Sequence, residues 1–312
     1  MRILAVGGTG FVGGAVVRRL LEGGHEVAAF HRGESSGGAE MFRGDRRDLP
    51  SFREAFQRFG PDVVLDTIAY TEAEAEGLVR TFHGVARRAV VLSSQDVYAA
   101  YGRLQRLESG APGPARLAEE APLRTSRYPY RARARPGEMA YDYDKILVEK
   151  AVLGRSELPV TILRLPFVYG PGDRQRRLQP YLERMAQRTV LLNRAKAAWR
   201  WTRGYVEDVA EAVAVACVDA RAAGRTYNVG EQDALTEAEW VRAIGEAAGW
   251  RGEVRAVSSR ELPEGLAEPY DFAHDLAADT RRIREELGFH EPVGRSEGLR
   301  RTVAWEGAQP AG

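Results

Sequence analysis

The stretch MRILAVGGTGFVGGAVVRRLLEGGHEVAAF, residues 1–30, contains the pattern that decides the fold. Its first six residues are an apolar run that predicts a strand, and a glycine-rich turn at 7–13 then leads into an apolar helical pattern. Gly23 and Gly24 end that helix, and residues 26–30 resume as a second strand. The segment therefore predicts a strand–helix–strand unit with two parallel strands.

The same alternation continues along the chain. It predicts an α/β fold, a doubly wound parallel sheet of the Rossmann type with helices on both faces. The expected strands are 41–42, 62–65, 89–92, 160–163 and 226–229, and the expected helices are 49–59, 72–82, 141–152 and 206–218. We expect residues 1–165 with 205–229 to form a dinucleotide-binding domain, and 166–204 with 230–312 to form a smaller mixed substrate-binding lobe.

The amino-acid composition limits the classes of molecule that the protein is expected to bind. The 312 residues include 45 basic and 44 acidic side chains, so no overall field favours nucleic acid or a membrane surface, and a small-molecule substrate is expected. The single cysteine, Cys217, excludes an intrachain disulfide, and the five histidines have no metal-ligand spacing. With no signal peptide and no apolar run of about 18 residues, we expect a cytoplasmic protein without a metal.

Gly8, Gly10 and Gly13 satisfy the G-x-G-x-x-G pattern directly after the first strand and at the start of a helix. In that context the glycines let the backbone approach a pyrophosphate, whose charge meets the helix N-terminal amides. We therefore expect a dinucleotide here. The cofactor-binding residues predicted in this loop are Gly7, Gly8, Thr9, Gly10, Phe11, Val12 and Gly13.

The end of the second strand indicates which cofactor is preferred. An acidic residue at this point binds the ribose hydroxyl of NAD, whereas an arginine accommodates the additional phosphate of NADP. The strand runs into His31, Arg32, Gly33 and Glu34. Arg32 favours NADP, and Glu34 leaves NAD open. The prediction is NAD(P), with NADP somewhat favoured over NAD.

Tyr141 lies four residues before Lys145, in a chain whose only other lysines are Lys150 and Lys196. With 12 tyrosines, this spacing is expected by chance only about 0.1 times. On a helix, residues four apart share a face, and a nearby ammonium lowers the pKa of a phenol. The pair predicts a proton-transfer site in which Tyr141→Phe abolishes turnover and leaves cofactor binding nearly intact.

Together, the glycine loop and the Tyr141/Lys145 pair resemble the extended branch of the short-chain dehydrogenase/reductase superfamily, the NAD-dependent epimerase/dehydratase family, over nearly the whole chain. Residues 92–98, LSSQDVY, resemble the segment that supplies the family's catalytic hydroxyl, here Ser94. Residues 44–46 and 67–69 resemble the adenine contact and the loop that covers the cofactor. Besides the glycine loop, the resemblance assigns cofactor contacts to His31, Arg32, Asp45, Arg46, Ile68, Ala69, Tyr70, Ser93, Pro166 and Val168.

The resemblance implies an enzyme that transfers a hydride between a nicotinamide cofactor and a hydroxyl or carbonyl carbon of a small substrate, with sugars among the candidates. Tyr141 would exchange a proton with the substrate oxygen, Lys145 would hold the nicotinamide ribose, and Ser94 would hydrogen-bond the same oxygen. It also implies a homodimer formed by the helices at 72–82 and 141–152.

Three departures from the family pattern concern the substrate. Ser94 is followed by Gln95-Asp96 where sugar-nucleotide dehydratases have an Asp-Glu pair, and a glutamine has no ionisable proton to donate. Phe167 stands where many nucleotide-sugar enzymes of the branch have an asparagine, and Trp201 where they usually have an arginine. Arg200 or Arg203 is left as a substitute for that arginine. A nucleotide-sugar substrate is therefore poorly supported.

The arginine-rich segment 124–135 precedes the catalytic pair and suggests a lid over an anionic substrate. Its interleaved tyrosines also suit single-stranded nucleic acid. Residues 30–33 and 44–48 also resemble the atypical branch that includes chloroplast stem-loop RNA-binding proteins. The alternative function is thus an RNA- or partner-binding protein with a bound cofactor and little turnover, although a net charge near zero disfavours RNA.

Overall fold

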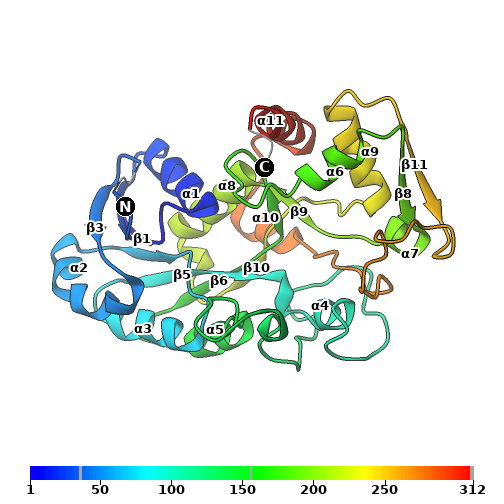
Figure 1. Ribbon diagram of the computed structural model, residues 1–312. Coiled ribbons are helices and arrows are strands. Elements are labelled where there is room, and N and C mark those ends of the chain that lie inside the picture. The colour runs from blue at the N-terminus through cyan, green and yellow to red at the C-terminus, as the bar shows by residue number, and fades with distance from the viewer. Residues whose placement is uncertain (35–36, 155–156, 310–312) are drawn as a thin grey trace.

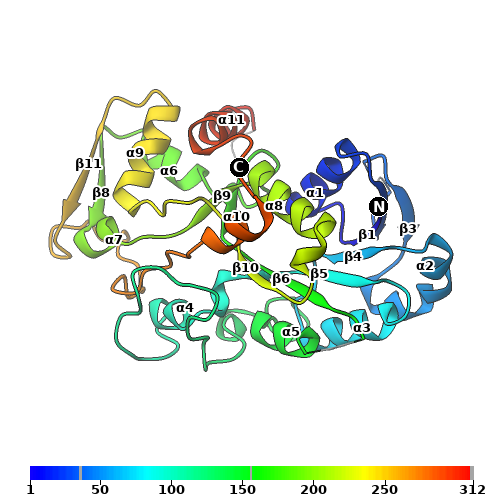
Figure 2. The ribbon, with the colours of Figure 1, turned by 180° about the vertical axis from the view of Figure 1, so that it is seen from behind.

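In a computed structural model that describes residues 1–34, 37–154 and 157–309, the centre of the molecule is a sheet of seven parallel strands (Figures 1 and 2). The strand order is β10-β6-β5-β4-β1-β2-β3. Strand order reverses between β1 and β4, as in doubly wound folds, so the predicted fold is confirmed. The strands are β1 (Arg2–Val6), β2 (Glu26–His31), β3 (Glu40–Arg43), β4 (Val63–Asp66), β5 (Arg88–Ser94), β6 (Val160–Leu165) and β10 (Thr226–Asn228).

Helices cover both faces of this sheet (Figure 1). On one face α1 (Phe11–Glu22) packs against α8 (Val206–Val218), and on the other lie α2 (Arg53–Phe59), α3 (Glu72–Phe82) and α5 (Lys145–Val152). Side chains of β1 alternate between two cores: Ile3 joins the α1/α8 side, whereas Leu4 joins the α2/α3/α5 side. Burial on both faces explains why the first strand is apolar throughout.

Two predicted helices differ from the observed ones. Residues 46–52 form a 3-10 helix, η1 (Arg46–Phe52), that contains Pro50, and α2 follows it. The predicted start of the helix at Tyr141 is wrong. The helix begins at Lys145, because Asp144 is in an extended conformation and its carboxylate accepts a hydrogen bond from Ile146 N at 3.0 Å as an N-cap. Tyr141 and Lys145 therefore do not share a helical face.

The remaining strands and helices lie outside the seven-stranded sheet. Two small parallel ribbons pair β7 (Phe167–Tyr169) with β9 (Arg203–Tyr205), and β8 (Thr189–Asn193) with β11 (Glu253–Val257). The second ribbon lies beyond the end of the large sheet with α6, α7 and α9 (Figure 1). The helices here are α4 (Ala99–Leu104), α6 (Gln179–Arg184), α7 (Arg194–Ala198), α9 (Glu237–Ala247), α10 (Arg281–Leu287) and α11 (Arg295–Gly307). The exact division into two lobes stays a prediction.

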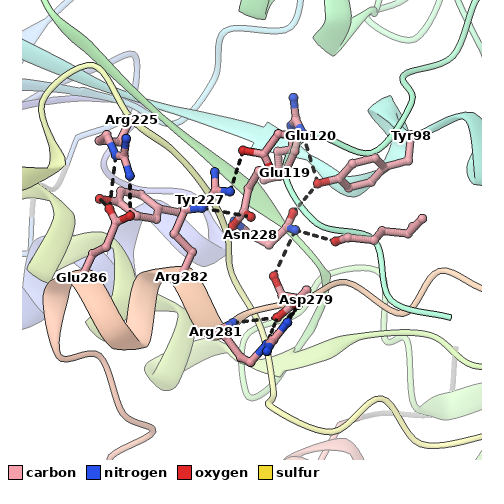
Figure 3. A network of polar contacts seen from close by, with 12 residues as sticks. Tyr98, Glu119, Glu120, Arg225, Tyr227, Asn228, Asp279, Arg281, Arg282 and Glu286 are labelled. Carbon is pink, nitrogen blue, oxygen red and sulfur yellow. Dashed lines mark hydrogen bonds and ion pairs between the residues drawn. The ribbon is translucent and has the colours of Figure 1, made fainter. Parts of the chain in front are cut away.

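A polar network fixes the carboxyl ends of β6 and β10. Arg164 of β6 donates to both carboxylate oxygens of Glu149 on α5, at 3.0 and 2.8 Å, and to the hydroxyl of Tyr98 at 3.1 Å. Tyr98 in turn donates to Asn228 Oδ1 at 2.7 Å. Figure 3 shows Tyr98 and Asn228 beside Glu119, with the ion pair of Arg225 and Glu286 farther out. The network ties distant segments to the sheet edge at which the site lies.

No helix among the described residues is long and apolar enough to cross a membrane.

Candidate active site

A cleft of about 730 Å³ lies across the carboxyl ends of the parallel strands. This edge, close to the reversal of strand order, is where open α/β sheets bind their ligands. Segments far apart in the sequence line the cleft: the glycine loop after β1, the ends of β4, β5 and β6, and aromatic residues around 199–201 and 270–272. The cleft is therefore continuous from the glycine loop to the aromatic residues outside the seven-stranded sheet.

The glycine loop has the form that a pyrophosphate requires. Gly7 has a φ of 88°, and a Cβ on Gly13 would lie 2.4 Å from the Gly7 carbonyl oxygen. Helix α1 begins after Gly10 with no side-chain cap, which leaves its first amides available to an anion. Gly7, Gly10, Phe11, Val12 and Gly13 line the cleft, whereas Gly8, which is buried, and Thr9, which is exposed, are not part of its lining. These residues fit the dinucleotide expected from the sequence.

Gly10 and Gly13 should respond differently to alanine. Gly13→Ala forces the new methyl group against a backbone oxygen, so we expect a loss of about 1–3 kcal/mol in the free energy of unfolding. A Cβ on Gly10 would lie 4.0 Å from the Gly7 carbonyl oxygen, an ordinary contact, so Gly10→Ala should fold normally and weaken dinucleotide binding by about tenfold or more. Urea denaturation and cofactor titration of both variants test this. Equal stability of the two variants would contradict it.

The residues predicted to surround the adenosine are not equally available. Arg46 is buried and makes two hydrogen bonds to Asp66, at 2.6 and 2.5 Å, so it holds the end of β4. Arg32 is 80% exposed, and its guanidinium lies 3.7 Å from Asp45. Hydrogen bonds from Arg47 lower the pKa of Asp45 to about 2. His31 is buried, and its ring accepts a hydrogen bond from Gly33 N. Of the charged residues assigned to the adenosine end, Arg32 has the most exposed side chain, against 23% for Asp45 and 7% for Arg46.

Lys145 lies at the other end of the cleft. Its Nζ donates to the carbonyl oxygens of Ala69 at 2.6 Å and Leu92 at 2.7 Å, which leaves one of the three ammonium donors for a ligand. Burial lowers the pKa of Lys145 to about 8. Ile68, Tyr70, Ser93, Pro166 and Val168 also line the cleft, whereas Ala69 contributes its carbonyl to Lys145.

Of the two tyrosines just before α5, Tyr143 lines the cleft and Tyr141 does not. Tyr143 lines the cleft beside Ser94 and donates to Asp96 Oδ2 at 2.8 Å. Tyr141 lies in the loop before α5, where its ring contacts the Arg131 guanidinium at 4.8 Å, and it is not among the described residues that line the cleft. Of the three residues predicted to be catalytic, Ser94 and Lys145 both line the cleft, whereas Tyr141 lies outside its described lining.

Asp96, like Tyr143, belongs to the site although neither was among the residues predicted for it. Its buried carboxylate accepts hydrogen bonds from Tyr143 and, at 3.1 Å, from Tyr130, whose hydroxyl contacts that of Tyr101 at 2.8 Å. Burial raises the pKa of Asp96, and burial together with Asp96 raises the pKa of Tyr143 well above its usual value. Arg124, on the opposite side of the carboxylate, opposes this by favouring the charged form of Asp96. Tyr143 is consequently a neutral hydrogen-bond donor at neutral pH.

The arginine-rich segment 124–135 supplies Tyr130 and Arg133 to the cleft. Its other arginines mostly bond within the protein. Arg124 is buried against the Asp96 backbone, Arg127 donates to carbonyls of its own loop, and Arg131 pairs with Asp142 at 2.9 Å. These three guanidinium groups are therefore engaged within the protein, whereas the side chain of Arg135 is 90% exposed.

Comparisons with known proteins identify a family and several similar proteins. A model of the NAD dependent epimerase/dehydratase family matches residues 3–230. The 2-alkyl-3-oxoalkanoate reductase of Stenotrophomonas maltophilia is 26% identical over 345 residues, covering 97% of this chain and 99% of the relative. The dTDP-glucose 4,6-dehydratase of Streptomyces griseus is 28% identical over 341 residues, covering 97% and 93%. The structure of Thermus thermophilus UDP-glucose 4-epimerase with NAD has a TM-score of 0.67 at 27% identity and 99% coverage of both chains.

Proposed function

Because this chain belongs to the NAD dependent epimerase/dehydratase family, we propose that it is an NAD(P)-dependent oxidoreductase or epimerase-like enzyme acting on a hydroxyl or carbonyl carbon of a small substrate. One observation carries the proposal: Lys145, Ser94 and Tyr143 converge on a cleft that is continuous with the glycine loop. A bound nicotinamide would supply or accept the hydride.

The chain's own residues would handle the substrate oxygen. Tyr143 has a single O–H, which turns from Asp96 to that oxygen as negative charge develops, and Ser94 provides a second donor. In the resting site Asp96 accepts that O–H at 2.8 Å, and the substrate oxygen replaces Asp96 as its acceptor. Lys145, anchored by two carbonyls, uses its remaining donor to hold the nicotinamide ribose. Tyr141 takes no direct part in this arrangement.

The names of the relatives indicate two directions for the substrate. One relative is named 2-alkyl-3-oxoalkanoate reductase, and another is named dTDP-glucose 4,6-dehydratase. Gln95 is buried and donates to the Val229 carbonyl at 3.1 Å, so it supplies no acid for dehydration. This favours reduction or epimerisation over dehydration. A homodimer through α3 and α5 and a cytoplasmic location remain predictions.

The proposed function is tested by the ligand that the protein retains and by what it oxidises. Mass spectrometry of the purified protein identifies any retained cofactor, and a panel of sugars, ketones and secondary alcohols is then screened for a change in NAD(P)H absorbance. Cofactor binding with turnover of at least one compound supports the proposal. No dinucleotide binding at millimolar concentration would overturn it, and salt-sensitive RNA binding without turnover would favour the alternative function.

We propose that Arg32 gives NADP its advantage over NAD. Arg32→Gln removes the exposed guanidinium, so the Kd for NADP⁺ should rise by about tenfold or more while the Kd for NAD⁺ changes little. Arg43→Gln is the matched control, because Arg43 is an exposed arginine near Glu34 on the neighbouring strand. Isothermal titration of both cofactors gives the comparison. Tighter binding of NAD⁺ than of NADP⁺ by the unaltered protein would refute the preference.

A further inference from the structure

The part of the cleft beyond the catalytic residues is a wall of aromatic rings. Successive ring centroids lie 4.6 Å (Phe167 to Trp201), 5.3 Å (Trp201 to Trp199), 5.5 Å (Trp199 to Phe272) and 6.0 Å (Phe272 to Tyr270) apart. We call these five residues the aromatic wall. All of them line the cleft. The wall is assembled from three segments, one after β6, one before β9 and one before α10.

The wall offers carbon surface more than hydrogen bonds. The indole N–H of Trp199 already donates to the His274 carbonyl at 2.8 Å, and Trp199 is only 5% exposed. Leu276 and Leu104 also line the cleft, and both are buried. Flat, rigid rings of this kind bind apolar or ring-shaped groups by burying their surface.

Most charges in this part of the cleft are already compensated. Arg177 pairs with Asp173 at 2.6 Å, and its guanidinium also lies over the Phe167 ring. Lys196 pairs with Glu268, a residue that lines the same cleft. Glu237 pairs with Arg203 and accepts a hydrogen bond from Tyr181 at 2.9 Å. A phosphate group here would have to compete with carboxylates for each of these cations.

The two arginines that could substitute for the family's arginine at position 201 are already engaged within the protein. Arg203 is 2% exposed and lies 4.4 Å from the Trp240 ring. Arg200 donates to the Ala234 carbonyl and lies 3.7 Å from Glu239, and it is outside the described lining of the cleft. Among the described lining residues, Arg133 is the one cation beyond Lys145 with no carboxylate within ion-pair distance, and its partner is the neutral Gln105. A substrate diphosphate in this part of the cleft would therefore find, among the described lining residues, one guanidinium that no carboxylate already pairs.

We propose that the substrate is a ketone or secondary alcohol with an apolar aryl or alkyl body, at most one anionic group and no diphosphate. Its body packs on the aromatic wall while its oxygen faces Ser94 and Tyr143, and Arg133 at the rim accommodates the single anion when there is one. This inference rests on the proposed hydride-transfer function and names the substrate class of that site. A nucleotide-sugar substrate is thereby excluded.

Equilibrium binding tests the substrate class without requiring turnover. Benzylacetone, a ketone with a phenyl body, and UDP-glucose are each titrated into the NADP⁺-saturated protein by calorimetry. We expect benzylacetone to bind with a Kd at least tenfold lower than that of UDP-glucose. Trp201→Ala should weaken benzylacetone binding at least fivefold and leave NADP⁺ binding unchanged. The control Trp305→Ala, in α11 and outside the cleft lining, should leave both unchanged.

The outcomes separate this inference from the proposed function. Tighter binding of UDP-glucose than of benzylacetone, or benzylacetone binding that Trp201→Ala does not weaken, overturns the substrate class. Oxidation of UDP-glucose with cofactor reduction would do so while supporting the proposed function. Benzylacetone bound at the wall with no hydride transfer to any tested ketone would support the substrate class and count against the proposed function.

Discussion

Replacing Tyr143 by phenylalanine should lower turnover by about 10²–10⁴-fold, the usual contribution of a positioned proton donor, while NAD(P) affinity stays within about twofold. The reason is local. Only the hydroxyl is removed, and that hydroxyl belongs to a cleft-lining residue and donates to Asp96 at 2.8 Å in the resting site. The ring can stay where it packs, 5.2 Å from that of Tyr130. Steady-state kinetics with a substrate from the panel and fluorescence titration of the cofactor measure the two effects.

Tyr141→Phe is the matched control, since it makes the same chemical change two residues away. Its ring lies against Arg131 outside the cleft lining, so turnover should change by less than about twofold. The opposite result, an inactive Tyr141→Phe variant and an active Tyr143→Phe variant, would support Tyr141 as the proton donor, as the sequence predicted. It would also mean that α5 begins earlier in the working enzyme than it does here.

Removing Arg164 should have the largest effect on stability. Arg164→Met leaves the Glu149 carboxylate buried without its cation, so the free energy of unfolding should fall by about 3–5 kcal/mol. The hydrogen bond from Ser93 to Glu149 is not enough to compensate a buried charge. Urea denaturation followed by circular dichroism gives the value.

Two comparisons show whether the buried charge is the cause. The double variant Arg164→Met/Glu149→Met should recover much of the loss, because neither charge is then left unpaired. Arg225→Met removes an ion pair with Glu286, whose partners are 49% and 33% exposed (Figure 3), and should cost less than about 1 kcal/mol. Equal losses for Arg164→Met and Arg225→Met would contradict this reading of the network.

The sheet was predictable because its signals are local. The apolar run of β1, the glycine turn and the capped helix α3 each lie within about a dozen consecutive residues, and the capping box of Thr71 and Glu74 begins α3 at the expected residue. The start of α5 was missed although a local signal was present. Asp144 directly before Lys145 is a strong N-cap residue, and reading it would have placed Tyr141 outside the helix.

Other parts of the site depend on contacts between distant segments. Arg46 looked like a cofactor contact, but its partner Asp66 lies 20 residues later, at the end of the neighbouring β4. Tyr130 and Tyr143, from the segment before α5, meet Asp96, which lies 34 and 47 residues earlier and just after β5. The aromatic wall joins Phe167, Trp201 and Phe272 across more than 100 residues. None of these proximities has a periodicity or spacing that a single sequence displays.

The central claim is that the glycine loop and the pair of Lys145 and Tyr143 bind the two ends of one nicotinamide dinucleotide. A crystal structure of the protein with NADP⁺ tests it most directly. We predict the pyrophosphate on the amides of Phe11 and Val12, a nicotinamide ribose hydroxyl within hydrogen-bond distance of Lys145 Nζ, and the nicotinamide ring beside Tyr143. A dinucleotide bound away from the glycine loop, or a nicotinamide that contacts Tyr141 with Tyr143 turned away, would contradict the account.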